Sequence, residues 1–459
     1  MTLRKIFSNK WFALFILLMA TILSPLDFYI VNLALPAIGK SLEANNSQLQ
    51  MIISFYTCAY AVFQISGARI GDIFGKKRVF LFGLLGFILS SVVCGLAIST
   101  TMMIIGRILQ GVFGAIMIPQ VLAILHVIFQ DKQKTKVMAL YSFTFGLAAA
   151  FGQYLGAVLI QWNLFNLGWR IIFLINLPIG LLAFMAGLFT LPKSEINQGV
   201  SSIDSLGSIV LVVGLIIGIY PLVTLSNTGF TLTTAMYFIL SIMLLVLFVK
   251  LQRKRKQQER SVLIDLSVFK YSNLKYGIIV CFLYYCSGVF YLAFGIYLQE
   301  ELGWGTIEAG KAIIPFGIGF LCSSLVSSHL NTYFKSKALI IGLCTYALGF
   351  ALMLFNLYCF SSVLLRISLL IIGCGMGLTL ASVVRLSLKG VPSAFAGLAS
   401  GLINSALQIG SAFGVAAIGS VFFIVAHKSD YSHAFGIVLL VLTIVQLIAI
   451  GFSMLIKEK

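Results

Sequence analysis

The stretch GARIGDIFGKKRV, residues 67–79, lies between two apolar runs at residues 48–70 and 79–98. Its three glycines are spaced four residues apart around one aspartate, and three consecutive basic residues follow. Glycine has no Cβ atom, so two helix ends can approach each other closely where it occurs. Basic residues beside an apolar run are typical of the cytoplasmic end of a membrane helix. The stretch therefore predicts a tight cytoplasmic connection between two transmembrane helices.

Apolar runs of similar length recur along the whole chain. The 459 residues are 60% hydrophobic and 10% charged, whereas soluble proteins carry about 25% charged residues. A run of about 20 apolar residues can cross a bilayer core of about 30 Å. The sequence predicts an all-α polytopic membrane protein with fourteen transmembrane helices, at residues 12–36, 48–70, 79–98, 102–126, 137–160, 171–191, 205–223, 231–250, 274–298, 306–328, 338–357, 362–384, 396–426 and 433–456.

The basic residues are distributed unevenly between the two sides of these helices. Of the 31 Lys and Arg residues, 25 fall on the side of the N-terminus. The other side has Lys40, Arg170, Lys311 and Lys428, and two more arginines fall inside apolar runs. Cytoplasmic loops carry such an excess of Lys and Arg. We therefore expect a multi-pass protein of the cell (inner) membrane with both termini cytoplasmic, and we read the net charge of +18 as a topology signal, not as a nucleic-acid surface.

An internal repeat relates the two halves of the chain. The segment RILQGVFGAIM begins at Arg107 and RISLLIIGCGM begins at Arg366, with matching Arg, Ile, Gly and Met at a constant offset of 259 residues. Two polar stretches, one near residue 196 and a basic one from residue 250, divide the helices as six, two and six. We expect an N-terminal six-helix bundle at 1–195, a two-helix insert with its cytoplasmic connector at 196–260, and a C-terminal six-helix bundle at 261–459.

Two charged residues fall deep inside predicted helices. Asp27 lies about ten residues, or ~15 Å, from the outer end of the first helix, and Arg107 lies ~9 Å from the same face of the fourth. A charge at such a depth usually faces the bundle interior and has a partner. Burial raises the pKa of a carboxyl group and a nearby cation lowers it, so small movements can load or unload a proton. The pair is therefore either a proton-coupling site or a static structural ion pair.

The chain resembles the major facilitator superfamily, whose signature loop is matched by GARIGDIFGKKRV. In its fourteen-span drug:proton antiporter branch, similar segments are LDFYIVNLALP (26–36), RILQGVFGA (107–115), GWRIIFLINLPIG (168–180), LIDLSVF, YLQEELGW and GLASGLINSALQIGSAFG. The resemblance covers essentially the whole chain. It implies a major facilitator fold of two six-helix bundles plus two inserted helices, and transport by alternating access.

The resemblance also implies a role for the signature loop. Its glycines would bring two helix ends together, while Asp72 would face the N-terminus of a neighbouring helix and hold one state of the transport cycle. Ile73 stands where the pattern expects a basic residue. The residues expected to form this conformational latch are Gly67, Gly71, Asp72, Gly75, Lys76, Lys77 and Arg78.

The fifth helix departs from the pattern of that branch, which expects a Gly-Pro pair followed by Gly-Gly. The segment GLAAAFGQYLGAV has Gln153 in place of the Pro and Ala157 in place of the second Gly. Gly152 and Gly156 keep a small-x-x-x-small face, which lets two membrane helices pack closely. We expect normal packing at these two glycines, and the departure bears on whether coupling is antiport.

The resemblance implies a proton-coupled secondary active transporter that exports small molecules, of the multidrug efflux type. The alternative is a dedicated exporter of an anionic endogenous metabolite, such as a siderophore; a membrane sensor or enzyme is a distant third. We expect no enzymatic activity, metal or cofactor, because the four His and eight Cys residues show no metal-binding or catalytic spacing. The expected partners are a small-molecule substrate, protons and the lipid bilayer, with no nucleic acid, and the expected state is a monomer.

Four polar residues inside the helices are candidates for the substrate cavity: Asn32, Gln110, Gln153 and Arg366. Arg366 is the repeat-equivalent of Arg107, so a cavity lined by both would hold two cations against one acid. Such a site would favour an anionic or zwitterionic substrate. Arg366 could instead extend to the outer membrane surface, since it lies only about four residues from the helix end.

Overall fold

The computed structural model describes residues 9–129, 132–192, 204–392 and 395–457. Within these residues, fourteen helices are long and apolar enough to cross a membrane, which confirms the predicted fold class. The described N-terminal helices are α2 (Lys10–Leu42), α3 (Asn46–Phe74), α4 (Lys76–Gly95), α5 (Thr100–Ile128), α6 (Lys132–Trp162), the short η1 (Leu164–Asn166), η2 (Gly168–Arg170) and α7 (Ile171–Leu174), and α8 (Asn176–Thr190).

Two more helices, α9 (Ser205–Thr228) and α10 (Leu232–Gln257), precede the short η3 (Leu266–Lys270). The ninth crossing is interrupted, and consists of α11 (Ser272–Tyr285), η4 (Cys286–Gly288), α12 (Val289–Ile296) and the π-helical η5 (Tyr297–Glu301). The remaining elements are α13 (Thr306–Ala312), α14 (Ile314–Phe334), α15 (Lys337–Cys359), α16 (Ser362–Leu388), α17 (Ala396–Phe413), η7 (Gly414–Ile418), α18 (Gly419–Lys428) and α19 (Tyr431–Ser453).

The first helix is longer than predicted. It continues through Pro36 to Leu42 and ends where Glu43 takes a left-handed conformation, with φ of 50°. A proline inside a helix removes one backbone hydrogen bond, and neighbouring helices in a membrane protein can compensate for it. Leu35 and Ile38 on either side of Pro36 are fully buried, so packing keeps this segment helical.

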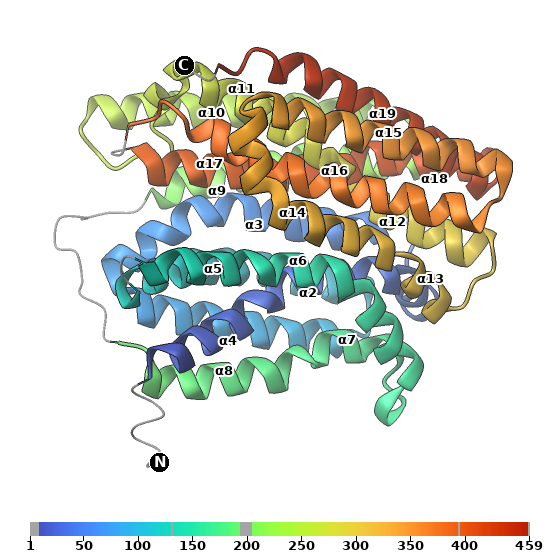
Figure 1. Ribbon diagram of the computed structural model, residues 1–459, viewed down its shortest axis with the longest axis horizontal. Helices are drawn as coiled ribbons and strands as arrows, with labels where there is room; N and C mark the ends of the chain where they lie inside the picture. Colours follow the sequence, from blue (N-terminus) through green and yellow to red (C-terminus); the bar gives the residue numbers. More distant parts are fainter. Residues whose placement is uncertain (1–8, 130–131, 193–203, 393–394, 458–459) are drawn as a thin grey trace.

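Figure 1 shows the helices α2 to α8 and the helices α11 to α19 as two bundles lying side by side. Helix α2 begins and α19 ends at the same end of the molecule, on the left of the view. We call this end the terminal side and the opposite end the far side. The bundles meet along α3 with α17, along α6 with α13 and α14, and along α2 with α12.

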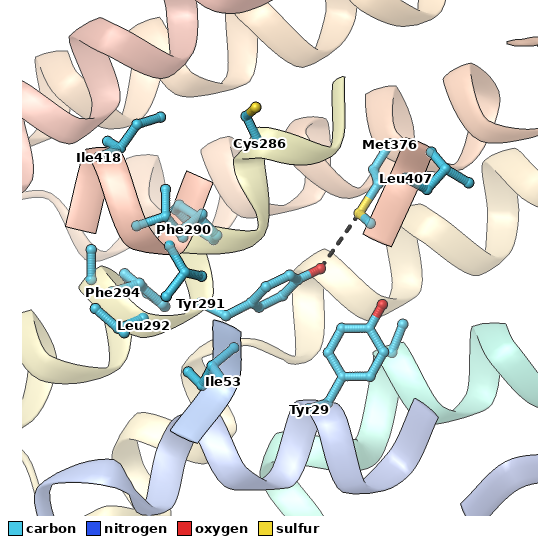
Figure 2. Close-up of a cluster of buried hydrophobic side chains, with 14 of the residues drawn as sticks. Tyr29, Ile53, Cys286, Phe290, Tyr291, Leu292, Phe294, Met376, Leu407 and Ile418 are labelled. Atoms are coloured by element: carbon cyan, nitrogen blue, oxygen red, sulfur yellow. Dashed lines mark hydrogen bonds between the residues drawn. The ribbon is translucent and has the colours of Figure 1, made fainter. Parts of the chain in front are cut away.

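On the far side the two bundles are in direct contact. Figure 2 shows Tyr29 of α2 beside Tyr291 of α12, and their ring centroids are 5.2 Å apart. The Tyr291 hydroxyl donates a hydrogen bond of 3.4 Å to the sulfur of Met376. Further out, Gln299 Nε2 donates to the carbonyl oxygen of Leu33 at 3.2 Å. The Tyr29–Tyr291 ring contact and the Gln299–Leu33 hydrogen bond therefore close the seam between the bundles on this side.

Helices α9 and α10 pack on each other, and α9 also packs on α3. Asp204, fully buried at the start of α9, accepts hydrogen bonds from the backbone N–H of Gly207 at 2.8 Å and from Gln252 of α10 at 2.6 Å. Arg255 lies 3.3 Å from the same carboxylate. Gln252 in turn accepts a hydrogen bond from the backbone N–H of Ile264 at 3.1 Å. This cluster attaches the connector after α10 to helices α9 and α10. The domain boundary that the sequence predicts between residues 195 and 196 lies outside the described residues.

We predict that Asp204→Ala loosens this connector. The substitution removes the N-cap of α9, which is worth about 0.5–2 kcal/mol, and leaves Arg255 and Gln252 without their acceptor. Trypsin should then cleave the basic segment between residues 250 and 260 several-fold faster. The matched control is Asp430→Ala, which removes the exposed N-cap of α19. Equal cleavage rates in the two variants would contradict the role given to Asp204.

Candidate functional site

A buried ion pair joins the first and fourth membrane helices. Arg107 of α5 donates through Nη1 to the Asp27 carboxylate of α2, and both side chains are completely buried. Arg107 also donates through Nε to the carbonyl oxygen of Ile52 at 3.1 Å and through Nη1 to Gln110 at 2.8 Å. The structure therefore brings together the two deep charges that the sequence singled out.

Neutral polar groups complete the surroundings of Asp27. Its Oδ1 atom accepts hydrogen bonds from Gln110 Nε2 at 3.1 Å and from Asn176 Nδ2 of α8 at 3.3 Å. Both amides also lie within hydrogen-bond distance of Ser91 Oγ of α4, at 2.7 and 3.1 Å. Helices α2, α4, α5 and α8 thus each contribute to one polar cluster. Sequence analysis did not single out Ser91 or Asn176, although Asn176 stands alone among apolar residues in the quoted stretch GWRIIFLINLPIG.

The ion pair has an aromatic neighbour. The centroid of the Tyr56 ring in α3 lies 4.1 Å from the guanidinium carbon of Arg107. At this distance the face of the ring attracts the cation. The Tyr56 hydroxyl also lies 2.9 Å from Ser24 Oγ, three residues before Asp27 in α2. Arg107 Nη2 has no hydrogen-bond partner among the described residues, so the ring face is the group placed to offset its burial.

A cavity of about 120 Å³ lies beside this cluster, between the two bundles. Seven of its twelve lining residues are aromatic and none is charged. Both bundles contribute to the lining, which consists of Ser24, Pro25, Phe28, Tyr29, Tyr56, Tyr60, Phe145, Tyr285, Phe320, Met376, Leu380 and Gln408. Residue pattern alone did not predict this lining, because Tyr and Phe are also abundant on lipid-facing and core positions of a membrane protein.

The four residues expected in the cavity are elsewhere. Gln110 belongs to the ion-pair cluster. Asn32 is buried in α2, where its Nδ2 donates to the carbonyl oxygen of Phe28 at 2.7 Å. Gln153 is buried in α6. Arg366 is exposed and lies near the start of α16, at the far side of the molecule. None of them lines the cavity.

Arg366 does not line this cavity, so the structure lends no support to a cavity with two arginines, which stays a prediction. With the offset of 259 residues that relates Arg107 to Arg366, the place of Asp27 falls on Cys286, an uncharged side chain. Without an acid there, a buried Arg366 would be an unpaired charge, which is strongly unfavourable. Its position near the helix end lets the long side chain extend to the polar surface instead.

The glycines of the signature loop lie at close helix contacts. A Cβ atom on Gly67 would come within 2.6 Å of the carbonyl oxygen of Ala115 in α5, and one on Gly71 would collide with the side chain of Gln120. Gln120 Nε2 also donates to the carbonyl oxygen of Gly67 at 2.6 Å. Gly75 has a φ of 90° and separates α3 from α4, a conformation that favours glycine.

The charged residues of this loop have different surroundings. Lys77 Nζ donates to the carbonyl oxygens of Leu188 and Leu191 at the end of α8, at 2.8 and 2.7 Å. Lys76 is half-buried and Arg78 is exposed. Asp72 is half-buried and forms no ion pair with the described residues, so its latch role stays a prediction. Arg69, just before it, donates to the carbonyl oxygen of Val262 in the connector.

Gly152 and Gly156 lie against α2. Their Cβ atoms would come within 2.8 Å of Tyr29 Cβ and 2.9 Å of Ile30 Cγ2, respectively. A different face of α6 meets α13, where a Cβ on Gly310 would lie 2.6 Å from Ala157 Cβ. Helix α6 is therefore packed closely against α2 of its own bundle and against α13 of the other bundle.

Two bundles of membrane helices that enclose a central cavity, with buried charges beside it, are the architecture of a secondary transporter. The family model described as Major Facilitator Superfamily matches residues 17–202 and 190–415. The chain belongs to the major facilitator superfamily. This family consists of transporters, which confirms the expectation of a non-enzymatic membrane transport protein.

The relatives and solved structures agree with this assignment. The chain is 31% identical to a protein named probable actinorhodin transporter from Streptomyces coelicolor, over 91% of this chain and 73% of the relative. It is 29% identical to the multidrug resistance protein Stp of Mycobacterium tuberculosis, over 86% and 73% of the two chains. The crystal structure of the peptide transporter POT with sulfate superposes with a TM-score of 0.68 at 14% identity, covering 97% of this chain and 96% of the other.

We predict that Gly67→Ala destabilises the protein by about 1–3 kcal/mol, the usual cost of overpacking a filled contact. The new methyl group would meet backbone atoms of α5, which cannot move aside as a flexible side chain can. Thermal unfolding in detergent measures the effect. The matched control is Gly401→Ala in α17, where no atom lies within 4 Å of the added Cβ. A Gly67→Ala protein as stable as the control would refute the close contact.

Proposed function

We propose that this protein is a proton-coupled exporter of small molecules, of the multidrug efflux type. The observation that carries the proposal is the completely buried Asp27–Arg107 pair beside an uncharged cavity between the two bundles. The names of its relatives, a probable actinorhodin transporter and a multidrug resistance protein, support export as the direction of transport.

The pair offers a simple coupling chemistry. Asp27 is the one acid buried at the middle of a membrane span among the described residues. Protonation would remove its charge and break the ion pair, leaving Arg107 with only neutral acceptors. Because a buried, unpaired charge is costly, the helices that carry the two residues would then favour a different arrangement. Rocking of one bundle against the other around the cavity would follow.

The orientation in the membrane follows from the basic residues. The signature loop and the last turns of α10 both lie on the terminal side and hold most of the clustered Lys and Arg residues. By the positive-inside rule we assign the terminal side, with both termini, to the cytoplasm. We also propose the division into 1–195, 196–260 and 261–459, and a monomer as the working unit.

The anionic-metabolite alternative rested on a second cation in the cavity. Arg366 is exposed, and the cavity lining holds no charged side chain. We therefore do not propose a siderophore-type exporter. Gln153 does not line the cavity, and α6 keeps its close contacts with α2. The presence of Gln153 where the family pattern expects proline therefore gives no reason to abandon antiport. Growth inhibition of an efflux-deficient host, measured across a compound panel with and without expression, tests the export function.

We predict that Asp27→Asn abolishes transport driven by a pH gradient while the protein still reaches the membrane. The amide retains the size of the side chain but cannot exchange a proton. Uptake into proteoliposomes under an imposed pH gradient measures the loss. Since the variant leaves Arg107 unpaired, the double variant Asp27→Asn/Arg107→Gln removes both charges and serves as a folded control with the same expected defect. Gradient-driven transport at the wild-type rate would reduce Asp27 to a structural role.

We predict that Asp72→Ala slows the transport cycle but spares substrate binding, because the loop lies on the terminal side, away from the cavity lining. The binding affinity and the transport rate are measured on the same preparation. The exposed Arg78→Ala serves as a control for loss of a charge in the same loop. A large loss of affinity with a normal transport rate would contradict the latch assignment.

A further inference from the structure

Helix α10 has two faces with opposite surroundings. One face packs on α9 and carries the buried residues Thr234, Ser241, Phe248 and Gln252. Only 17% of the apolar part of α10 is buried inside the protein, the smallest share among the fourteen described spans. In a membrane, the other face of α10 therefore borders lipid and not another helix of this chain.

The lipid-facing side of α10 changes from apolar to basic within one turn. Residues three, four and seven positions apart share one helix face, and the exposed apolar side chains at this spacing are Met236, Ile239, Leu240, Met243, Val246 and Leu247. The same spacing leads from Met243 to Lys250 and from Leu247 to Lys254, and Arg253 lies beside these two lysines. All three cations are exposed. They follow the apolar band directly, where the acyl chains of a bilayer end and the headgroups begin.

The three cations have no carboxylate partner among the described residues, whereas the next two cations along the chain do. Arg255 lies 3.3 Å from Asp204 of α9, and Lys256 Nζ lies 2.6 Å from Asp265 of the connector. Glu259, the one acid between residues 250 and 260, lies beyond the end of the helix. An anion that approaches from the lipid therefore meets three positive charges that no acid of α10 offsets.

We propose that Lys250, Arg253 and Lys254, the basic end of α10, bind the phosphate headgroup of an anionic phospholipid whose acyl chains lie along the apolar face of the same helix. Clusters of Lys and Arg directly beyond a membrane helix are typical binding sites for anionic lipids. Arginine can bind two phosphate oxygens at once, and lysine binds phosphate as a point charge. A soluble anion would use the charges but not the apolar face, so the arrangement favours a lipid over free phosphate.

The connector joins the basic end of α10 to the N-terminal bundle. Arg255, which follows Lys254, donates through Nε to the carbonyl oxygen of Ser261 at 3.0 Å. Arg69, near the end of α3, donates to the carbonyl oxygen of the next connector residue, Val262. A bound lipid would hold an end of α10 that is linked in this way to the helix that bears the signature loop. Because a ligand of the folded state stabilises it, the lipid should raise the unfolding temperature of the protein.

The lipid class is tested by native mass spectrometry of the purified full-length protein with phosphatidylglycerol and phosphatidylcholine that carry the same acyl chains. The wild type should bind phosphatidylglycerol more tightly. Glycerophosphoglycerol, the same headgroup without acyl chains, should not displace the bound phosphatidylglycerol. Equal binding of the two lipids by the wild type overturns the proposal, and displacement by the free headgroup at equal concentration shows a site for soluble anions instead, which also overturns it.

The site is tested with the variant Lys250→Gln/Arg253→Gln/Lys254→Gln. It should bind phosphatidylglycerol roughly 10- to 100-fold more weakly, because each Lys or Arg near a membrane surface contributes about fivefold. Its affinity for phosphatidylcholine should not change. The conservative variant Lys250→Arg/Lys254→Arg retains the charges and should retain the affinity for phosphatidylglycerol.

The matched control is Lys335→Gln/Lys337→Gln/Lys389→Gln, which removes the same charge from exposed positions at the terminal-side ends of α14, α15 and α16. It should keep the wild-type affinity for phosphatidylglycerol. Unfolding temperatures without lipid check that both triple variants are folded. Added phosphatidylglycerol should raise the unfolding temperature of the wild type and the control, but not that of the α10 variant. An equal loss of affinity in the two triple variants would mean that binding follows net charge alone, and overturns the site.

Discussion

The burial of one ion pair in an apolar protein constrains most of the N-terminal bundle. The side chains of Asp27 and Arg107 have no exposed surface, so their charges must be offset by groups inside the protein. Gln110, Asn176 and the carbonyl of Ile52 supply hydrogen bonds, and Tyr56 supplies a ring face. Five helices, α2, α3, α4, α5 and α8, are thereby tied to one point, and any movement of that point must involve all of them.

Close backbone contact is the second requirement, because helices in a membrane gain little from the hydrophobic effect against each other. The signature loop meets it with Gly67 and Gly71 at the contact of α3 with α5, and α6 meets it with small residues on both faces. Each bundle is therefore closely packed internally. The seam between them runs where α3 meets α17 and where α6 meets α13 and α14, and it includes the far-side contact of Tyr29 with Tyr291 in Figure 2.

Sequence reasoning predicted the features that stand out against an apolar background. Fourteen helices follow from runs of apolar residues and basic loops, and Asp27 and Arg107 are the two deep charges of the N-terminal half. It did not find Ser91, Asn176 or Tyr56, since small polar residues and the 17 tyrosines occur throughout such a chain and periodicity does not say which face the cavity. The repeat also did not indicate that Arg366 is exposed in this structure, because the repeat matches residue types but not their partners, and Cys286, at the place equivalent to Asp27, is not an acid. The π-helical and 3-10 interruptions near residues 286–301 also leave no simple sequence pattern.

The presence of an acid in one repeat and of Cys286 at the equivalent place in the other has a consequence for the work the transporter can do. Within the proposed function, a single buried carboxylate carries one proton per cycle. One elementary charge crossing 100 mV releases about 2.3 kcal/mol, and a tenfold concentration ratio of an uncharged solute stores about 1.4 kcal/mol. Each 100 mV of driving force can therefore sustain a substrate gradient of roughly 40-fold by these two values, and no improvement in binding affinity can raise that ceiling.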